Sequence, residues 1–293
     1  MRKSFSILKA TALEILSEPF SLLILLTALT MAVLAPAFHY HQFGEPTRMA
    51  RDAGFSALFT CGSVLAVFGT IRAFRREVES GTLEMALAHP VSRGGFFLAK
   101  AAGAFVAYLV FATVVFGTGL AIVWGAAVDG RLAAQTGGLA QVFGPALAAG
   151  VAVILLPLVV AAALNRFARF RFVLTAFSLA FLLALLFGGA ALALAPRPLA
   201  KYFPVALLLV CPALVLLAAS AAFAVRFRAN AAASAVGLVF AALLPAVGNY
   251  YLSDALSKGG AVPWPYVGLA ALAALPAVAA FLLLGVRFMN RQE

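Results

Sequence analysis

The sequence predicts an all-α fold, a polytopic transmembrane helical bundle of about eight spans that begins with a helix at the membrane interface. Hydrophobic residues make up 65% of the 293 positions and charged residues only 11%, whereas soluble domains carry about 25% charged residues. The mean hydropathy is +1.06. The apolar residues also form runs of about 20, the length of a helix that crosses a bilayer. A soluble fold is therefore excluded.

Eight apolar runs have the length of a span. They are Phe20–Phe38, Gly54–Phe74, Ala101–Ala127, Leu139–Leu164, Phe172–Ala195, Phe203–Ala224, Ala229–Tyr250 and Trp264–Val286. Because the connections between them are short, we expect a single transmembrane domain over residues 1–293, with almost nothing left for an extramembrane domain.

The first 19 residues predict a helix in the membrane interface rather than a span. Phe5, Leu8, Ala12 and Ile15 recur at intervals of three or four residues, so one helical face is apolar. We expect that face to lie in lipid. Pro19 then ends the helix, because proline disrupts helical hydrogen bonding, and turns the chain into the first span. A frayed basic terminus is the alternative.

The distribution of Lys and Arg predicts that both termini are cytoplasmic. Eight spans place the termini on one side of the membrane, and fifteen of the 21 Lys and Arg residues fall on that side. Cytoplasmic loops retain positive charge in this way. The net charge of +11 is then explained by contact with anionic membrane lipid, so nucleic acid is not expected as a partner.

Ionisable side chains are almost absent from the predicted spans, and this excludes several functional classes. No acidic residue lies well inside a span, although such residues commonly mark ion paths or proton relays. This argues against a proton- or sodium-coupled carrier and against a cation channel. We also find no carboxylate, His or Cys constellation for a membrane-embedded enzyme, so no catalytic or metal site is expected.

One short stretch, Arg72–Lys100, concentrates charge between the second and third spans. It holds eight of the chain's 31 charged residues. We expect a short amphipathic helix that stops before Pro90, because the residue before a proline avoids the helical conformation. Ser92 is then placed to cap the next helix. A charge-rich loop held between two spans is a place where a soluble partner can bind.

Within this stretch, Glu77-x-x-x-Gly81-Thr82-Leu83-Glu84 is followed by Pro90-Val91-Ser92-Arg93, and then by Phe96 and Lys100. This ordered motif, placed directly after the second span, resembles the coupling segment of ABC-2 type permeases, here residues 75–95. These permeases are the membrane subunits of ATP-binding-cassette exporters, and they include the group like the nitrous-oxide-reductase maturation permease. The first 18 residues are similar to the interfacial elbow helix of the family.

The resemblance implies that the segment docks on a separate cytoplasmic ATP-binding-cassette ATPase. The residues to which it gives a coupling role are Glu77, Gly81, Thr82, Leu83, Pro90, Ser92 and Arg93. It also implies a pair of permease chains, identical or different, in the inner cell membrane with a pair of ATPases. The commonest members of the family have six spans, so one apolar hairpin here is alternatively re-entrant.

The chain contains no Gly-x-x-x-x-Gly-Lys-Ser/Thr phosphate-binding loop. We therefore expect no ATPase site and no cofactor of its own, with ATP and Mg²⁺ held by the partner. A second interpretation is a membrane scaffold or assembly factor that binds a cytoplasmic protein without transport. Glu77→Lys or Gly81→Pro is expected to abolish coupled transport while membrane insertion is retained.

Overall fold

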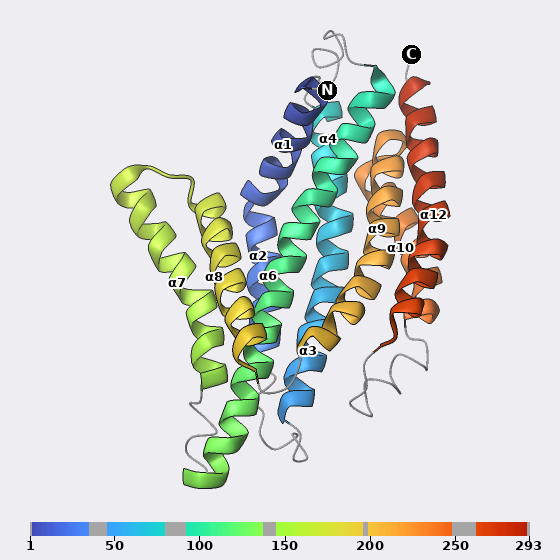
Figure 1. Cartoon of the computed structure of the whole chain (residues 1–293). Coiled ribbons are helices and arrows are strands. Elements are labelled where there is room, and N and C mark those ends of the chain that lie inside the picture. Colours follow the sequence, from blue (N-terminus) through green and yellow to red (C-terminus); the bar gives the residue numbers. More distant parts are fainter. Residues whose placement is uncertain are drawn as a thin grey trace. The chain divides into compact units, whose positions relative to one another are not determined.

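The computed structural model describes residues 2–34, 46–79, 92–136, 145–195, 199–247 and 262–291. The elements in these ranges are all helical, which confirms the predicted fold class (Figure 1). In chain order they are α1 (Arg2–Ser17), α2 (Pro19–Leu34), α3 (Pro46–Val64), the π-helical turn η3 (Leu65–Gly69), α4 (Thr70–Glu79), α6 (Arg93–Thr136), α7 (Pro145–Ala168), α8 (Phe172–Leu194), the 3-10 turn η5 (Leu199–Tyr202), α9 (Phe203–Arg226), α10 (Ala229–Val247) and α12 (Trp264–Asn290).

A helix lies at each of the eight predicted spans, but not all of these helices are long and apolar enough to cross a bilayer. Six helical stretches in the described part of the chain pass that test: Thr47–Glu77, Arg93–Val128, Ala148–Ala168, Phe172–Leu194, Leu199–Arg226 and Trp264–Asn290. The bent pair α1–α2 would be a seventh, and the apolar part of α10, Ala229–Leu243, is shorter. The predicted count of eight spans is therefore higher than the six or seven that the described helices support.

The described helices group into two compact units. Unit 1 contains Met1–Ile15, Ser63–Tyr108 and Lys201–Glu293, and unit 2 contains Leu16–Gly62 and Leu109–Ala200. The helix α6 contributes its first part to unit 1 and the remainder to unit 2. The single domain over residues 1–293 stays a prediction.

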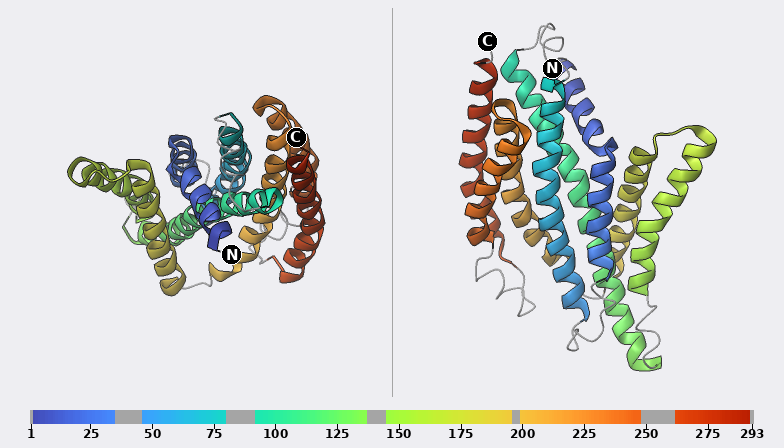
Figure 2. Two further views of the ribbon diagram at one scale, coloured as in Figure 1. Left: turned by 90° about the horizontal axis from the view of Figure 1, so that it is seen from above. Right: turned by 180° about the vertical axis from the view of Figure 1, so that it is seen from behind.

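In unit 1, α4, α10 and α12 all pack against α9. Leu216 and Ala219 of α9 are fully buried together with Val236 of α10. The first turn of α1, the end of α4, the beginning of α6 and the last turn of α12 lie toward the same end of this unit (Figures 1 and 2). This placement fits the prediction that the two termini lie on one side of the membrane.

In unit 2, α2 packs against α7 and α8, and these two helices pack against each other. Leu22, Ala161 and Ala176 form a small buried cluster between the three helices. The helices α6 and α8 also approach closely, because a Cβ atom built on Gly188 would lie 2.9 Å from Gly117 Cα. Small residues commonly allow such close contact between membrane helices.

The predicted break at Pro19 is confirmed, but the predicted lipid-facing side of α1 is wrong in part. The helix α1 ends at Ser17 and α2 begins at Pro19, and the chain bends there by 63°. Phe5 is exposed, as expected for a lipid-facing side chain, whereas Ala12 and Ile15 are buried. The reason is that the C-terminal half of the apolar face of α1 packs against other helices.

The second predicted span contains a π-helical turn at Leu65–Gly69, with Leu65, Ala66 and Gly69 buried. A π-helical turn interrupts the regular i to i−4 hydrogen bonding and is often found at functional sites. Here it separates α3 from α4, the helix that leads into the predicted coupling segment.

Candidate functional site

The predicted coupling segment begins on α4 and ends on α6, and both of these parts belong to unit 1. We call Thr70–Glu79 and Ser92–Lys100 together the base of the segment. Three of the predicted coupling residues, Glu77, Ser92 and Arg93, lie in the base. The other four, Gly81, Thr82, Leu83 and Pro90, lie outside the described residues.

Ser92 caps α6, as the sequence predicts. The backbone N–H of Gly95 donates to Ser92 Oγ over 3.2 Å, and the backbone N–H of Phe96 donates to the Ser92 carbonyl oxygen over 2.9 Å. A serine in this position satisfies an N–H group that has no partner inside the helix. The helix therefore begins at Arg93, earlier than the predicted start of the third span at Ala101.

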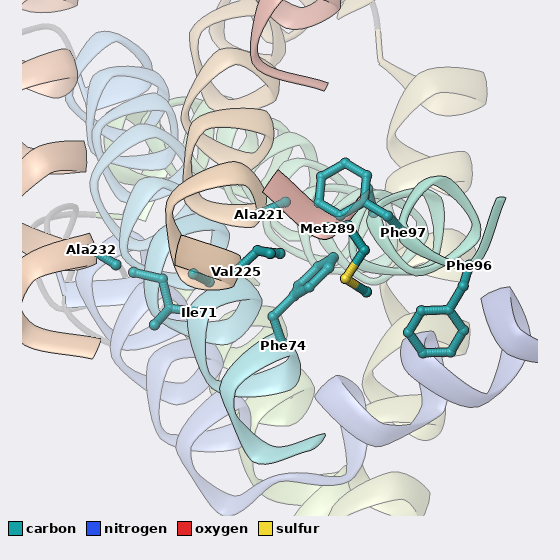
Figure 3. Close-up of a cluster of buried hydrophobic side chains, with 10 residues drawn as sticks. Ile71, Phe74, Phe96, Phe97, Ala221, Val225, Ala232 and Met289 are labelled. Atoms are coloured by element: carbon teal, nitrogen blue, oxygen red, sulfur yellow. The ribbon is translucent and has the colours of Figure 1, made fainter. Parts of the chain in front are cut away.

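A buried apolar cluster attaches both halves of the base to the rest of unit 1. The rings of Phe74 on α4 and Phe97 on α6 have centroids 5.4 Å apart, and Met289 of α12 reaches the same place (Figure 3). The buried members of the cluster are Ile71, Phe74, Phe96, Phe97, Ala101, Ala221, Ala224, Val225, Ala232 and Met289. Because α4, α6, α9, α10 and α12 all contribute, the two ends of the segment share one core.

The cluster borders a buried ion pair between the two halves of the base. Lys100 Nζ on α6 lies 2.6 Å from Glu77 Oε2 on α4, and the lysine side chain is 0% exposed. The ammonium also lies 5.4 Å from the ring centroid of Phe74 and 5.9 Å from that of Phe96. Among the described residues no acceptor meets Nζ with hydrogen-bond geometry, so the contact with Glu77 is best described as a close ion pair.

This ion pair changes the interpretation of Glu77. The resemblance gives Glu77 a role in coupling to the ATPase, whereas in the structure its carboxylate contacts α6 and its side chain is 27% exposed. The sequence contains a signal for the burial of Lys100, because it lies four residues after the apolar Phe96 and residues four apart share a helical face. Nothing in the sequence identifies Glu77 as its partner.

Two further contacts bind the end of α4 to other helices. Arg76 Nη1 lies 3.6 Å from Glu14 Oε1 on α1, and Arg75 Nη1 donates to the Phe227 carbonyl oxygen at the turn between α9 and α10 over 3.4 Å. Successive residues of a helix point about 100° apart, so Arg75, Arg76 and Glu77 contact three different elements. Neither contact could be predicted from the sequence, because the partners are far apart in the chain.

The base is joined to several other helices of unit 1. No group of three or more His, Cys, Asp or Glu side chains that could hold a metal ion occurs in the described ranges. An ion pair joins the base to α1, a hydrogen bond joins it to the turn between α9 and α10, and apolar packing joins it to α9, α10 and α12. The base therefore contacts side chains from each of these helices.

The chain was compared with known proteins. Residues 6–181 match the family model described as "ABC-2 family transporter protein". The matched range covers more than half of the chain and includes the whole of the predicted coupling segment with its base. No curated protein and no solved structure matches the chain significantly.

Proposed function

Because the chain belongs to the ABC-2 family of transporter proteins, we propose that it is the permease subunit of an ATP-binding-cassette export system. It is a multi-pass membrane protein and a membrane component of an ABC system. The proposed partner is a separate cytoplasmic ATPase that binds ATP and Mg²⁺ and drives export. The observation that supports this partner is the coupling motif, whose two ends lie on one shared core of unit 1.

Coupling requires that a movement of the ATPase reach the spans. The base supports such a role because its residues contact four other helices of unit 1 through Arg75, Arg76 and the apolar cluster. Packed side chains switch between discrete arrangements rather than deforming continuously. A segment attached in this way would displace whole helices, and we assign docking to Gly81, Thr82, Leu83, Pro90, Ser92 and Arg93.

The family also supports a proposed assembly and orientation. We expect two permease chains, identical or different, with two ATPases in the inner cell membrane and with both termini cytoplasmic. The excess of Lys and Arg on one side and the position of the beginning of α1 and the end of α12 at one end of unit 1 (Figure 1) support this orientation. Within the family, the motif favours the group like the nitrous-oxide-reductase maturation permease.

The first test is a mild-detergent affinity purification of the tagged chain from its native membranes, followed by identification of the recovered proteins and an assay of ATP hydrolysis. We expect an ATP-binding-cassette ATPase to be recovered with the chain. Leu83→Asp and Gly81→Pro should reduce its recovery at least tenfold at equal permease levels. Lys9→Glu, at an exposed position of α1, is the control and should retain it.

Two results would contradict the proposal. Full recovery of the ATPase with both Leu83→Asp and Gly81→Pro would exclude these residues from docking. Recovery of a well-folded chain without any ATPase, under conditions that preserve a control ABC transporter, would favour a membrane scaffold instead.

A further inference from the structure

We propose that Glu77 and Lys100 act as an internal strut that holds the two ends of the coupling segment at a set separation, and that Glu77 is a positioning residue rather than a docking residue. The part of this inference that concerns coupling rests on the proposed function. The part that concerns the contact between α4 and α6 does not.

The burial of Lys100 is the first step. Its side chain is 0% exposed, and a buried ammonium is strongly unfavourable unless an opposite charge compensates for the lost hydration. Glu77 supplies that charge at 2.6 Å. The rings of Phe74 and Phe96 add to it, because the face of an aromatic ring attracts a cation. The environment of Lys100 therefore suits a cation, with the Glu77 carboxylate in contact and the Glu14 carboxylate near enough to attract it.

The position of the pair along the chain is the second step. Glu77 lies near the beginning of the segment and Lys100 just after its end, so the ion pair connects the helix on which the segment begins to the helix on which it ends. Phe74 and Phe97 connect the same two helices through apolar contact, which is not directional. The ion pair adds a contact that depends on the distance between two specific atoms.

The exposure of Glu77 is the third step. A carboxylate that docks on another protein has to present its charge to that protein, whereas the Glu77 carboxylate is engaged by Lys100 and its side chain is mostly covered. Docking is then left to residues closer to the middle of the segment, such as Thr82 and Leu83. Glu77→Lys alone does not separate a positioning role from a docking role, because it breaks the ion pair and at the same time reverses a partly exposed charge.

A charge exchange separates them. The variants are Glu77→Lys, Lys100→Glu and the double variant that carries both, with Lys9→Glu as the control for an exposed charge reversal. The measurements are the Tm of the purified chain in detergent and the amount of ABC ATPase recovered with it. We expect each single variant to lower the Tm by at least about 5 °C. The double variant should regain more than half of that loss and recover the ATPase at near wild-type levels.

The carboxylate introduced by Lys100→Glu would lie beside aromatic rings, whose faces attract cations and not anions. A second set of variants therefore tests the ion pair by removing charges instead of exchanging them. Glu77→Met leaves Lys100 buried without its partner, whereas Glu77→Met combined with Lys100→Met removes both charges. A strut predicts a higher Tm for this double variant than for Glu77→Met alone.

The outcomes distinguish the hypotheses. The strut is wrong if neither double variant is stabilised. That is, the exchanged variant has a Tm no higher than that of its less stable single variant, and Glu77→Met with Lys100→Met has a Tm no higher than that of Glu77→Met. If the exchanged pair regains its Tm but recovers no ATPase, Glu77 docks directly and the positioning role is wrong. If the wild-type chain itself recovers no ATPase, the proposed function fails, while the Tm comparisons still decide whether the strut exists.

Discussion

Gly103 on α6 faces the carbonyl oxygen of Leu8 on α1 so closely that a Cβ atom on Gly103 would lie 2.6 Å from that oxygen. The same Cβ atom would lie 2.8 Å from Thr11 Cβ. The N-terminal helix therefore packs directly on the backbone of α6. Ala12 and Ile15 are also buried, so moving α1 away from the helices that cover it would expose apolar surface.

Gly103→Ala should destabilise the chain. The added methyl group would meet backbone that cannot move without shifting α1, and overpacking of this kind costs about 1–3 kcal/mol. The control is Gly237→Ala on α10, where a Cβ atom would meet nothing within 4 Å. Because alanine favours a helix over glycine by about 1 kcal/mol, the control should be at least as stable as wild type. Equal Tm values for the two variants would contradict the close packing of α1.

Gly285→Ala should disturb the apolar cluster of the base. A Cβ atom on Gly285 of α12 would overlap the ring of Phe97, and this ring is fully buried. The ring would have to leave its position against Phe74 and Met289 (Figure 3). We expect a lower Tm for Gly285→Ala and a partial recovery when Phe97→Leu is added, since leucine is smaller. Strictly additive losses would show that the two residues do not contact each other.

The crossing of α6 and α8 offers a matched pair of substitutions in unit 2. Gly188→Ala would place a methyl group 2.9 Å from both Gly117 Cα and its carbonyl oxygen, whereas Gly189→Ala would meet nothing within 4 Å. We expect Gly188→Ala to lower the amount of folded chain in the membrane and its Tm, and Gly189→Ala to leave both near wild type. Fluorescence-detected size exclusion of a tagged chain measures the two quantities. If Gly189→Ala lowered these two quantities more than Gly188→Ala, the close crossing of α6 and α8 would be refuted.

The two ion pairs of the base should differ strongly in strength. Arg76 and Glu14 have side chains 67% and 28% exposed, and an exposed pair contributes about 0.2–1 kcal/mol. Glu14→Gln should therefore lower the free energy of unfolding by no more than about 1 kcal/mol, and less at high salt. Removal of one partner of a buried pair costs about 3–5 kcal/mol, and Glu77→Gln should approach that range. Similar losses for Glu14→Gln and Glu77→Gln would contradict the different burial of the two pairs.

Features that depend on neighbouring residues could be predicted from the sequence. The apolar runs locate the helices because the length and hydropathy of a span are properties of consecutive residues. The break at Pro19 and the cap at Ser92 are confirmed for the same reason, since each depends on backbone groups within one turn. The ends predicted from hydropathy alone are less accurate. The third apolar run starts at Ala101, whereas α6 begins at Arg93, because the Ser92 cap and not hydropathy sets its first residue.

Contacts between helices could not be predicted in the same way. The apolar periodicity of α1 predicts an apolar face, but lipid and protein both satisfy such a face, and only packing places Ala12 and Ile15 inside. The contact of Arg75 with Phe227 joins residues 152 positions apart. Its existence depends on which helices lie together, and hydropathy carries no information on that choice.

The sequence by itself determined that the chain is an all-α membrane protein, where its apolar helices lie, and which short segment resembles a coupling motif. Only the tertiary structure decided that Glu77 contacts Lys100 within the base, with Lys100 wholly buried. The physical reason is that hydrophobicity is summed along consecutive residues, whereas the state of a charged side chain depends on the groups that folding brings within a few ångströms of it.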